Sequence, residues 1–182
     1  MAAAIENIMV TQAVAQLEDV FRAHQACVLM AAYRITGSMA DAEDVSQSVF
    51  LRLAHGTVDP GRISNLQGYL HRSAVNAALD LIRSRGHREV VPVETADELE
   101  ANSSLSPERA LSSLEIKNWL RRELATLSPR AAEMFALRYL EGLDNPEIAR
   151  TMNTSQAVVA VTLHRSRARL KKGLRAFMKG AS

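Results

Sequence analysis

The chain has 182 residues, of which 47% are hydrophobic, 23% charged and only 4% aromatic, a globular composition in which so few aromatics favour packed helices over a sheet. The single cysteine, Cys27, excludes an internal disulfide framework and fits a reducing cytoplasm, and with no apolar run of roughly 18 residues and no signal-like N-terminus we expect no direct membrane insertion. The net charge of +2 is unevenly spread, because residues 116–182 hold 13 basic and 5 acidic residues while residues 92–115 hold 1 and 6.

Three helices are predicted in the first half from apolar residues that recur every three or four positions. The first ends just before Ser38, whose spacing to Asp41 is that of a reciprocal capping box. The second helix runs from this cap to about Ala54, and the third from about Leu66 to Ser84. After them the polar, acidic stretch indicates a linker.

Four more helices are predicted in the second half, starting near Pro107, at Ser128-Pro129, after Asp144 and after Ser155. The last two are joined by a tight turn, and the final helix runs into a basic tail. This is the layout of a helix-turn-helix. The charge distribution agrees with a polyanionic partner such as nucleic acid, although a solvated helix face gives the same charge.

The second helix is predicted to present Asp44, Gln47 and Leu51 opposite its apolar residues, with Asp41 and Glu43 beside them. Acidic residues near a helix N-terminus are favoured by the helix dipole, so helix stabilisation explains the acids. It does not explain an exposed Leu51, which is typical of a protein-binding surface. On geometry alone both interpretations stay open.

The outward stripe of the third helix is predicted to contain Arg72, Asn76, Leu79 and Arg83. Such a mixture is most often a solvated face. It also matches what phosphate contact and base-edge hydrogen bonding require, so the pattern does not decide.

The final helix gives the strongest signal for DNA binding. Its inward stripe is predicted to contain Val159, Leu163, Ser166 and Leu170. The opposite face holds Ala157, Val161, Arg165, Ala168 and Lys172, and further Arg and Lys residues flank it as phosphate contacts would require.

Enzymatic functions have little support in the sequence. The five histidines are scattered, and His24 with Cys27 gives two ligands where a zinc site needs more. No glycine-rich phosphate loop and no nucleophile-histidine-acid order is present. We therefore expect no catalytic residues, metal, cofactor or small-molecule substrate.

Four segments in chain order resemble the motifs of one family. Residues 41–51 read DAEDVSQSVFL and resemble D-A-E-D-x-x-Q-x-x-F-L, and residues 69–83 resemble W-L-x-x-I-A-x-N-x-x-x-D-x-x-R with Tyr69 for tryptophan. Residues 127–143 resemble L-P-x-x-x-R-x-x-x-L-R-x-x-x-G-L, and residues 142–167 resemble the G-L-S-x-x-E-I-A helix-turn-helix that follows it. These are the motifs of bacterial sigma-70 factors of the extracytoplasmic-function (ECF) group.

The resemblance implies an all-α protein with two small helical domains joined by an acidic flexible linker. Residues 1–90 would bind core RNA polymerase and recognise and melt the minus-ten element. Residues 91–107 would be the linker, and residues 108–182 would read the minus-thirty-five element. The partners implied are core polymerase, promoter DNA and an anti-sigma factor. The place implied is the bacterial cytoplasm, at the nucleoid when active or at the membrane through the anti-sigma factor.

The resemblance also implies roles for particular residues. Core polymerase would meet Asp41, Glu43, Asp44, Gln47 and Leu51. Minus-ten DNA would meet Arg62, Arg72, Asn76, Leu79 and Arg83, with the loop from His55 to Asn65 holding a flipped-out base. Minus-thirty-five DNA would meet Ser155, Gln156, Ala157, Val161, Thr162, Arg165 and Arg169.

One departure from the family pattern concerns the final helix. The usual T-V-K-S-R is replaced by residues 158–162, VVAVT, which removes two basic residues and leaves Val161 outward. Recognition through thymine methyl groups is one consequence. Another interpretation is a sigma-like mimic or adaptor that binds an anti-sigma factor without loading promoters. A third is a stand-alone helix-turn-helix repressor, which has no need of the acidic second helix.

Overall fold

The structure, a computed structural model, describes residues 2–55, 63, 65–86 and 107–180. These residues form seven helices and no strand: α1 (Ala2–Thr36), α2 (Met39–Ala54), α3 (Leu66–Gly86), α5 (Pro107–Thr126), α6 (Pro129–Tyr139), α7 (Asn145–Thr151) and α8 (Gln156–Gly180). The predicted all-α class is therefore confirmed, with helix ends within a few residues of those expected. The acidic linker lies almost wholly outside the described residues, so the boundaries drawn there remain predictions.

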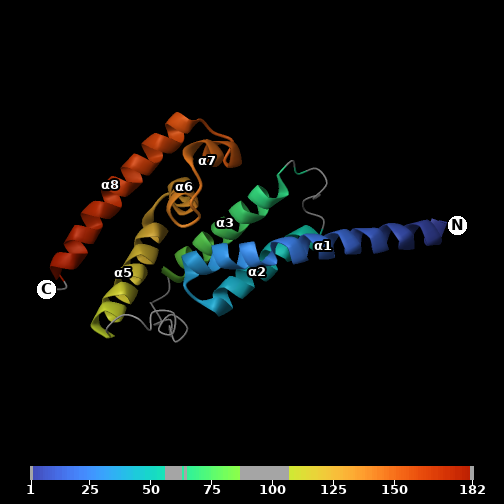
Figure 1. The fold of residues 1–182 in the computed structure, drawn as a ribbon, viewed down its shortest axis with the longest axis horizontal. Coiled ribbons are helices and arrows are strands. Elements are labelled where there is room, and N and C mark those ends of the chain that lie inside the picture. Colours follow the sequence, from blue (N-terminus) through green and yellow to red (C-terminus); the bar gives the residue numbers. More distant parts are fainter. Residues whose placement is uncertain (1, 56–62, 64, 87–106, 181–182) are drawn as a thin grey trace.

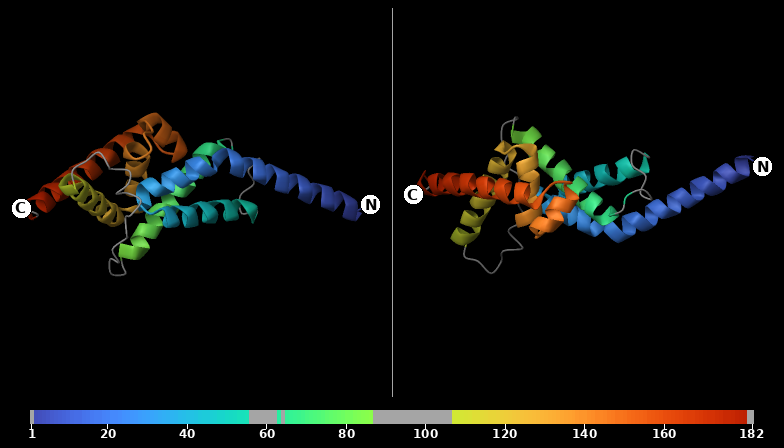
Figure 2. Two further views of the ribbon diagram at one scale, coloured as in Figure 1. Left: turned by 60° about the horizontal axis from the view of Figure 1, so that its bottom comes forward. Right: turned by 90° about the horizontal axis from the view of Figure 1, so that it is seen from above.

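Helices α1, α2 and α3 form the N-terminal domain. Val28 and Ala31 of α1, Val49 and Phe50 of α2 and Leu70 of α3 are buried together in one apolar cluster. The N-terminal half of α1 extends well beyond this cluster, away from the rest of the molecule (Figures 1 and 2). The domain is thus an antiparallel helix set with one long projecting arm.

Helices α5 to α8 form the C-terminal domain, in which α8 lies across one side and crosses close to α5 (Figure 1). Trp119 of α5 stacks on Phe177 of α8 with ring centroids 6.0 Å apart. Asn153, with a φ of 47°, makes the tight turn between α7 and α8. Asn tolerates this left-handed conformation better than most residues do, so the predicted helix-turn-helix has the local chemistry it needs.

The helix caps differ in part from the expectation. Ser38 Oγ accepts a hydrogen bond from the Asp41 backbone N–H at 3.3 Å, but the Asp41 carboxylate does not return to Ser38. It instead accepts from both terminal nitrogens of Arg85 at the end of α3. The predicted reciprocal box is therefore wrong, because a two-point bond to a cation is stronger than one to a backbone amide. A complete box occurs in α7, between Asp144 and Glu147.

The two domains share a hydrophobic core. Val75, Ala78 and Leu79 of α3 belong to the same buried cluster as Met134 and Leu137 of α6. Helix α3 contacts α5, α6 and α7 as well as α1 and α2, so it lies between the two domains. In Figure 1 it occupies the middle of the molecule.

Candidate polymerase and nucleic-acid interfaces

The outward face of α2 lies as the sequence predicts. Asp44 and Gln47 are exposed, as is Glu43 beside them, and Leu51 is 55% exposed. The opposite residues Ala42, Val45, Val49 and Leu53 are buried and hold this face outward. An acidic and amide surface with an exposed leucine at its end is suited to a protein partner, since solvation alone does not require the leucine.

Asp41 does not belong to that surface. It is only 6% exposed, and its carboxylate ties the start of α2 to Arg85 at the end of α3. The expectation of an accessible Asp41 is wrong because its partner lies 44 positions away, where helical periodicity gives no information. Among the five residues expected to meet polymerase, Asp41 alone is buried.

The predicted outward stripe of α3 is packed against the C-terminal domain. Arg72 Nε donates to Glu133 Oε1 of α6 at 2.5 Å, and Arg72 Nη1 donates to the Thr151 carbonyl oxygen at 3.1 Å. Asn76 Nδ2 donates to the same Glu133 oxygen at 3.0 Å. Leu79 is fully buried in the shared core. The expectation of an open stripe is therefore wrong in this arrangement of the domains.

The other two residues expected at minus-ten DNA differ from each other. Arg83 Nη1 donates to Asp80 Oδ1 at 2.9 Å, and its side chain is 19% exposed, so it too is largely covered. Arg62 and most of the loop from His55 to Asn65 lie outside the described residues. Nothing in the described geometry tests a base-holding role for that loop.

Two buried acids of the C-terminal domain receive the α3 side chains, and sequence reasoning missed both. Besides Glu133, Glu141 Oε2 is bonded to His71 Nε2 at 2.6 Å and accepts from Arg34 Nη1 at 2.7 Å. The Glu141 side chain is 1% exposed. A signal existed for Glu133, because residues 136 and 137, one turn further along the same face, are both apolar.

The recognition helix α8 matches its prediction. Ser155 Oγ accepts from the Val158 backbone N–H at 3.2 Å and caps the helix. The inward stripe Val159, Leu163, Ser166 and Leu170 is buried. On the outer side Gln156, Ala157, Val161 (49%), Arg165 and Arg169 are exposed, and Thr162 is half-buried. The outer face thus offers two exposed valines, Val158 and Val161, between polar ends.

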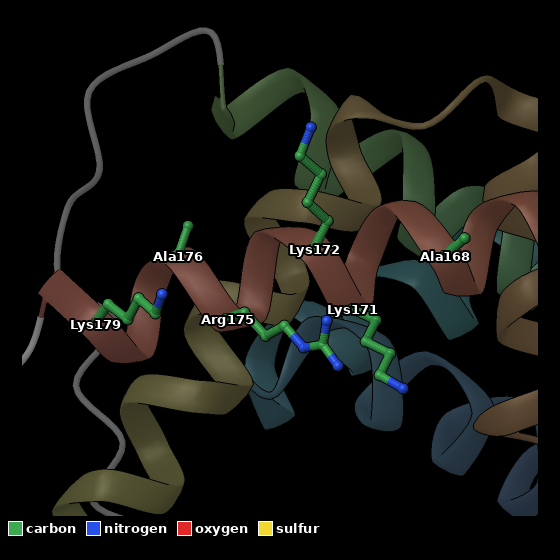
Figure 3. A pocket seen from close by; sticks show the side chains of 6 residues that line it. All are labelled: Ala168, Lys171, Lys172, Arg175, Ala176 and Lys179. Atoms are coloured by element: carbon green, nitrogen blue, oxygen red, sulfur yellow. The ribbon is translucent and has the colours of Figure 1, made fainter.

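Basic side chains continue along α8 beyond this face. Lys171, Lys172, Arg175 and Lys179, with Ala168 and Ala176, line a shallow open hollow (Figure 3). Lys172 points to one side of the helix, whereas Lys171 and Arg175 point to the other (Figure 3). Cations on both flanks are placed to neutralise phosphates rather than to enclose a small molecule.

The chemistry of the described surfaces is that of binding. Within residues 2–55, 63, 65–86 and 107–180, no three His, Cys, Asp or Glu side chains gather in a way that would hold a metal ion. Among the helices of that same part, none combines the length and the apolar character needed to cross a bilayer. The fold and surfaces define a two-domain helical protein whose second domain carries a helix-turn-helix.

Comparison with known proteins assigns this architecture to a family. Residues 20–88 match the family model of sigma-70 region 2, and residues 117–170 match that of sigma-70 region 4. The ECF RNA polymerase sigma factor SigE of Mycolicibacterium smegmatis is 31% identical over 156 residues, which cover 85% of this chain and 60% of that protein. The ECF RNA polymerase sigma factor SigW of Bacillus subtilis is 29% identical over 174 residues, covering 90% of this chain and 89% of the relative.

A further relative is the RNA polymerase sigma-H factor of Pseudomonas aeruginosa, 27% identical over 155 residues, with 81% of this chain and 80% of the relative covered. The two family models meet the N-terminal and C-terminal domains in the order that the structure shows. The chain therefore belongs to the sigma-70 family, as an ECF RNA polymerase sigma factor.

Proposed function

We propose that this chain binds core RNA polymerase, directs it to particular promoters and has no catalytic activity of its own. The observation that carries the proposal is the pairing of two surfaces in one chain. The α2 face with Asp44, Gln47 and Leu51 is exposed and suited to protein, while α8 presents a basic helix-turn-helix. A stand-alone repressor would need only the second.

The proposed division of labour follows the domains. The α2 face would dock on polymerase, where opposite charge and one apolar anchor favour a defined orientation. α8 would lie in the major groove at the minus-thirty-five element, with Arg165 and Lys172 near phosphates and Val161 near base edges. Arg72, Asn76 and Arg83 of α3 would meet minus-ten DNA once that face is open.

Control by an anti-sigma factor is part of the proposal. Leu51, Val158 and Val161 are exposed apolar residues on the surfaces that polymerase and DNA would use. A protein that covers them would gain apolar burial and block both partners at once. We infer action in the bacterial cytoplasm at the nucleoid, with an inhibitor able to hold the protein at the membrane.

The test is holoenzyme formation on native gels with purified bacterial core polymerase, followed by run-off transcription from genomic fragments. Asp44→Lys combined with Leu51→Ala is expected to abolish holoenzyme formation without changing the melting temperature. The matched control makes the same changes on α5, at Glu115 and Ile116, and should bind normally. Normal holoenzyme formation by the α2 variant would refute the polymerase surface. Binding without promoter-specific transcripts would identify a mimic instead.

A further inference from the structure

The contact between the two domains is built from polar groups as well as from the shared core. Two acids of the C-terminal domain accept from four side chains of α1 and α3. We call this set the clasp: Glu133, Glu141, Arg34, His71, Arg72 and Asn76. Its bonds are 2.5–3.0 Å long and join residues between 57 and 107 positions apart.

The clasp uses donors that promoter DNA would need. Arg72 and Asn76 both donate to a single carboxylate oxygen of Glu133, as they would to a phosphate or base acceptor. Leu79, one turn further along α3, is fully buried by the same packing. DNA and Glu133 therefore compete for the same side chains, and both cannot hold them together.

The burial of the two acids makes the clasp strong while it is complete. The side chains of Glu133 and Glu141 are 8% and 1% exposed. A buried carboxylate that loses its donors is left uncompensated, which strongly disfavours partial opening. If the domains separate fully, water solvates both acids, so a complete opening loses much less than breaking one bond inside the interface. The contact thus has two preferred states, closed and open.

The polymerase surface stays open while the DNA surface is closed. Asp44, Gln47 and Leu51 lie on α2, away from the clasp, and are exposed in the closed arrangement. Val161 and Arg165 on the outer face of α8 are exposed as well. A partner can dock on α2 without first displacing the C-terminal domain, whereas minus-ten DNA cannot reach Arg72 or Asn76.

We propose that the clasp is an autoinhibitory contact, by which the free protein covers its own minus-ten surface with Glu133 and Glu141 until polymerase separates the domains. This inference rests on the proposed function for the meaning of the covered surface. Its physical content, a closed free state that excludes single-stranded DNA, is separate. Polymerase binding comes first and DNA binding second.

The test compares the full-length protein with Glu133→Gln and Glu141→Gln. Each change keeps the side-chain shape and weakens a buried charged bond. The radius of gyration in solution is expected to rise in both variants. Affinity for a fluorescein-labelled single-stranded oligonucleotide pool of randomised sequence should rise about tenfold, the effect of losing one such bond. Glu141→Gln leaves Arg72, Asn76 and Glu133 intact, so its effect must come from opening.

The matched control is Glu115→Gln, an exposed acid on α5 that removes the same charge without touching the clasp. It corrects for the general gain in DNA affinity that follows any loss of negative charge. An unchanged radius in both clasp variants, or a gain in affinity no larger than that of Glu115→Gln, would overturn the inference. A wild-type protein already extended in solution would overturn it too.

Core polymerase binding by the same proteins separates this inference from the proposed function. A wild-type protein that fails to form holoenzyme contradicts the proposed function, while the radius and oligonucleotide affinity still decide on the clasp. Conversely, normal holoenzyme with unresponsive clasp variants overturns only the clasp. Melting curves followed through Trp119, the single tryptophan, establish that each variant is folded.

Discussion

The guanidinium of Arg121 on α5 lies where a side chain at position 37 would be. A Cβ added to Gly37 would come within 1.7 Å of Arg121 Nη2, and Arg121 Nε donates to the Ile35 carbonyl oxygen at 3.3 Å. Gly37 has a φ of 70°, so glycine here serves both the turn after α1 and the approach of the second domain.

We predict that Gly37→Ala lowers the free energy of unfolding by roughly 1–3 kcal/mol. The backbone strain of a left-handed alanine contributes about 1–2 kcal/mol, and the displaced guanidinium loses its bond to Ile35. Urea unfolding followed by Trp119 fluorescence measures the change. In an Arg121→Ala background only the strain remains, so the cost of Gly37→Ala should become smaller. An equal cost in both backgrounds would show that the two residues do not interact.

A second prediction concerns the ion pair between Asp41 and Arg85, which joins the first turn of α2 to the last turn of α3. Asp41→Asn is expected to lower the free energy of unfolding by about 1–3 kcal/mol, as for a charged hydrogen bond at a part-buried site. Below its melting temperature the variant should still form holoenzyme, since Asp41 is structural here. Asp44→Asn, an exposed neighbour, is the control and should unfold like the wild type. Lost polymerase binding by a fully folded Asp41→Asn would return Asp41 to the polymerase surface.

The sequence predicted every described helix because caps, prolines and apolar periodicity are local signals. It misplaced one face of α3 for a physical reason. Leu70 and Ala74 define one apolar arc, but Val75 and Leu79 form a second arc roughly half a turn away. A helix between two domains buries both arcs, and a projection that allows one buried side assigns the other to solvent. Which residues fill that second side, Glu133 among them, depends on contacts some 57–61 positions away.

The buried position of Leu79 yields a third prediction. Leu79→Ala should lower the free energy of unfolding by about 2–5 kcal/mol, the usual cost of truncating a leucine in a packed core. Leu51→Ala makes the same chemical change at a 55% exposed position and should stay within about 0.5 kcal/mol of the wild type. Denaturant unfolding of both variants is the measurement. Similar small effects would place Leu79 on an open face, as the helical projection alone suggested.

The last prediction concerns Val161, which is 49% exposed on the outer face of α8, about half a turn from the buried Val159, Leu163 and Leu170 stripe. An exposed valine adds nothing to the core, so its role needs a partner. If that partner is the major groove, Val161→Asp should abolish binding to duplex promoter DNA through repulsion by phosphates, while the melting temperature stays the same.

Val161→Arg should act in the opposite direction. It should raise affinity for promoter and random duplexes alike and steepen the salt dependence by up to one phosphate contact, a slope change of about 0.9. Discrimination between the two duplexes should fall, because the new contact reads charge rather than sequence. Ile116→Arg, an equal charge change at an exposed apolar residue of α5, controls for net charge. Fluorescence anisotropy of the full-length proteins across a salt series measures all of this, since Val161 is accessible in the closed arrangement. If neither Val161 variant alters DNA binding, the exposed valine belongs to a protein-binding surface and α8 does not read thymine methyl groups through it.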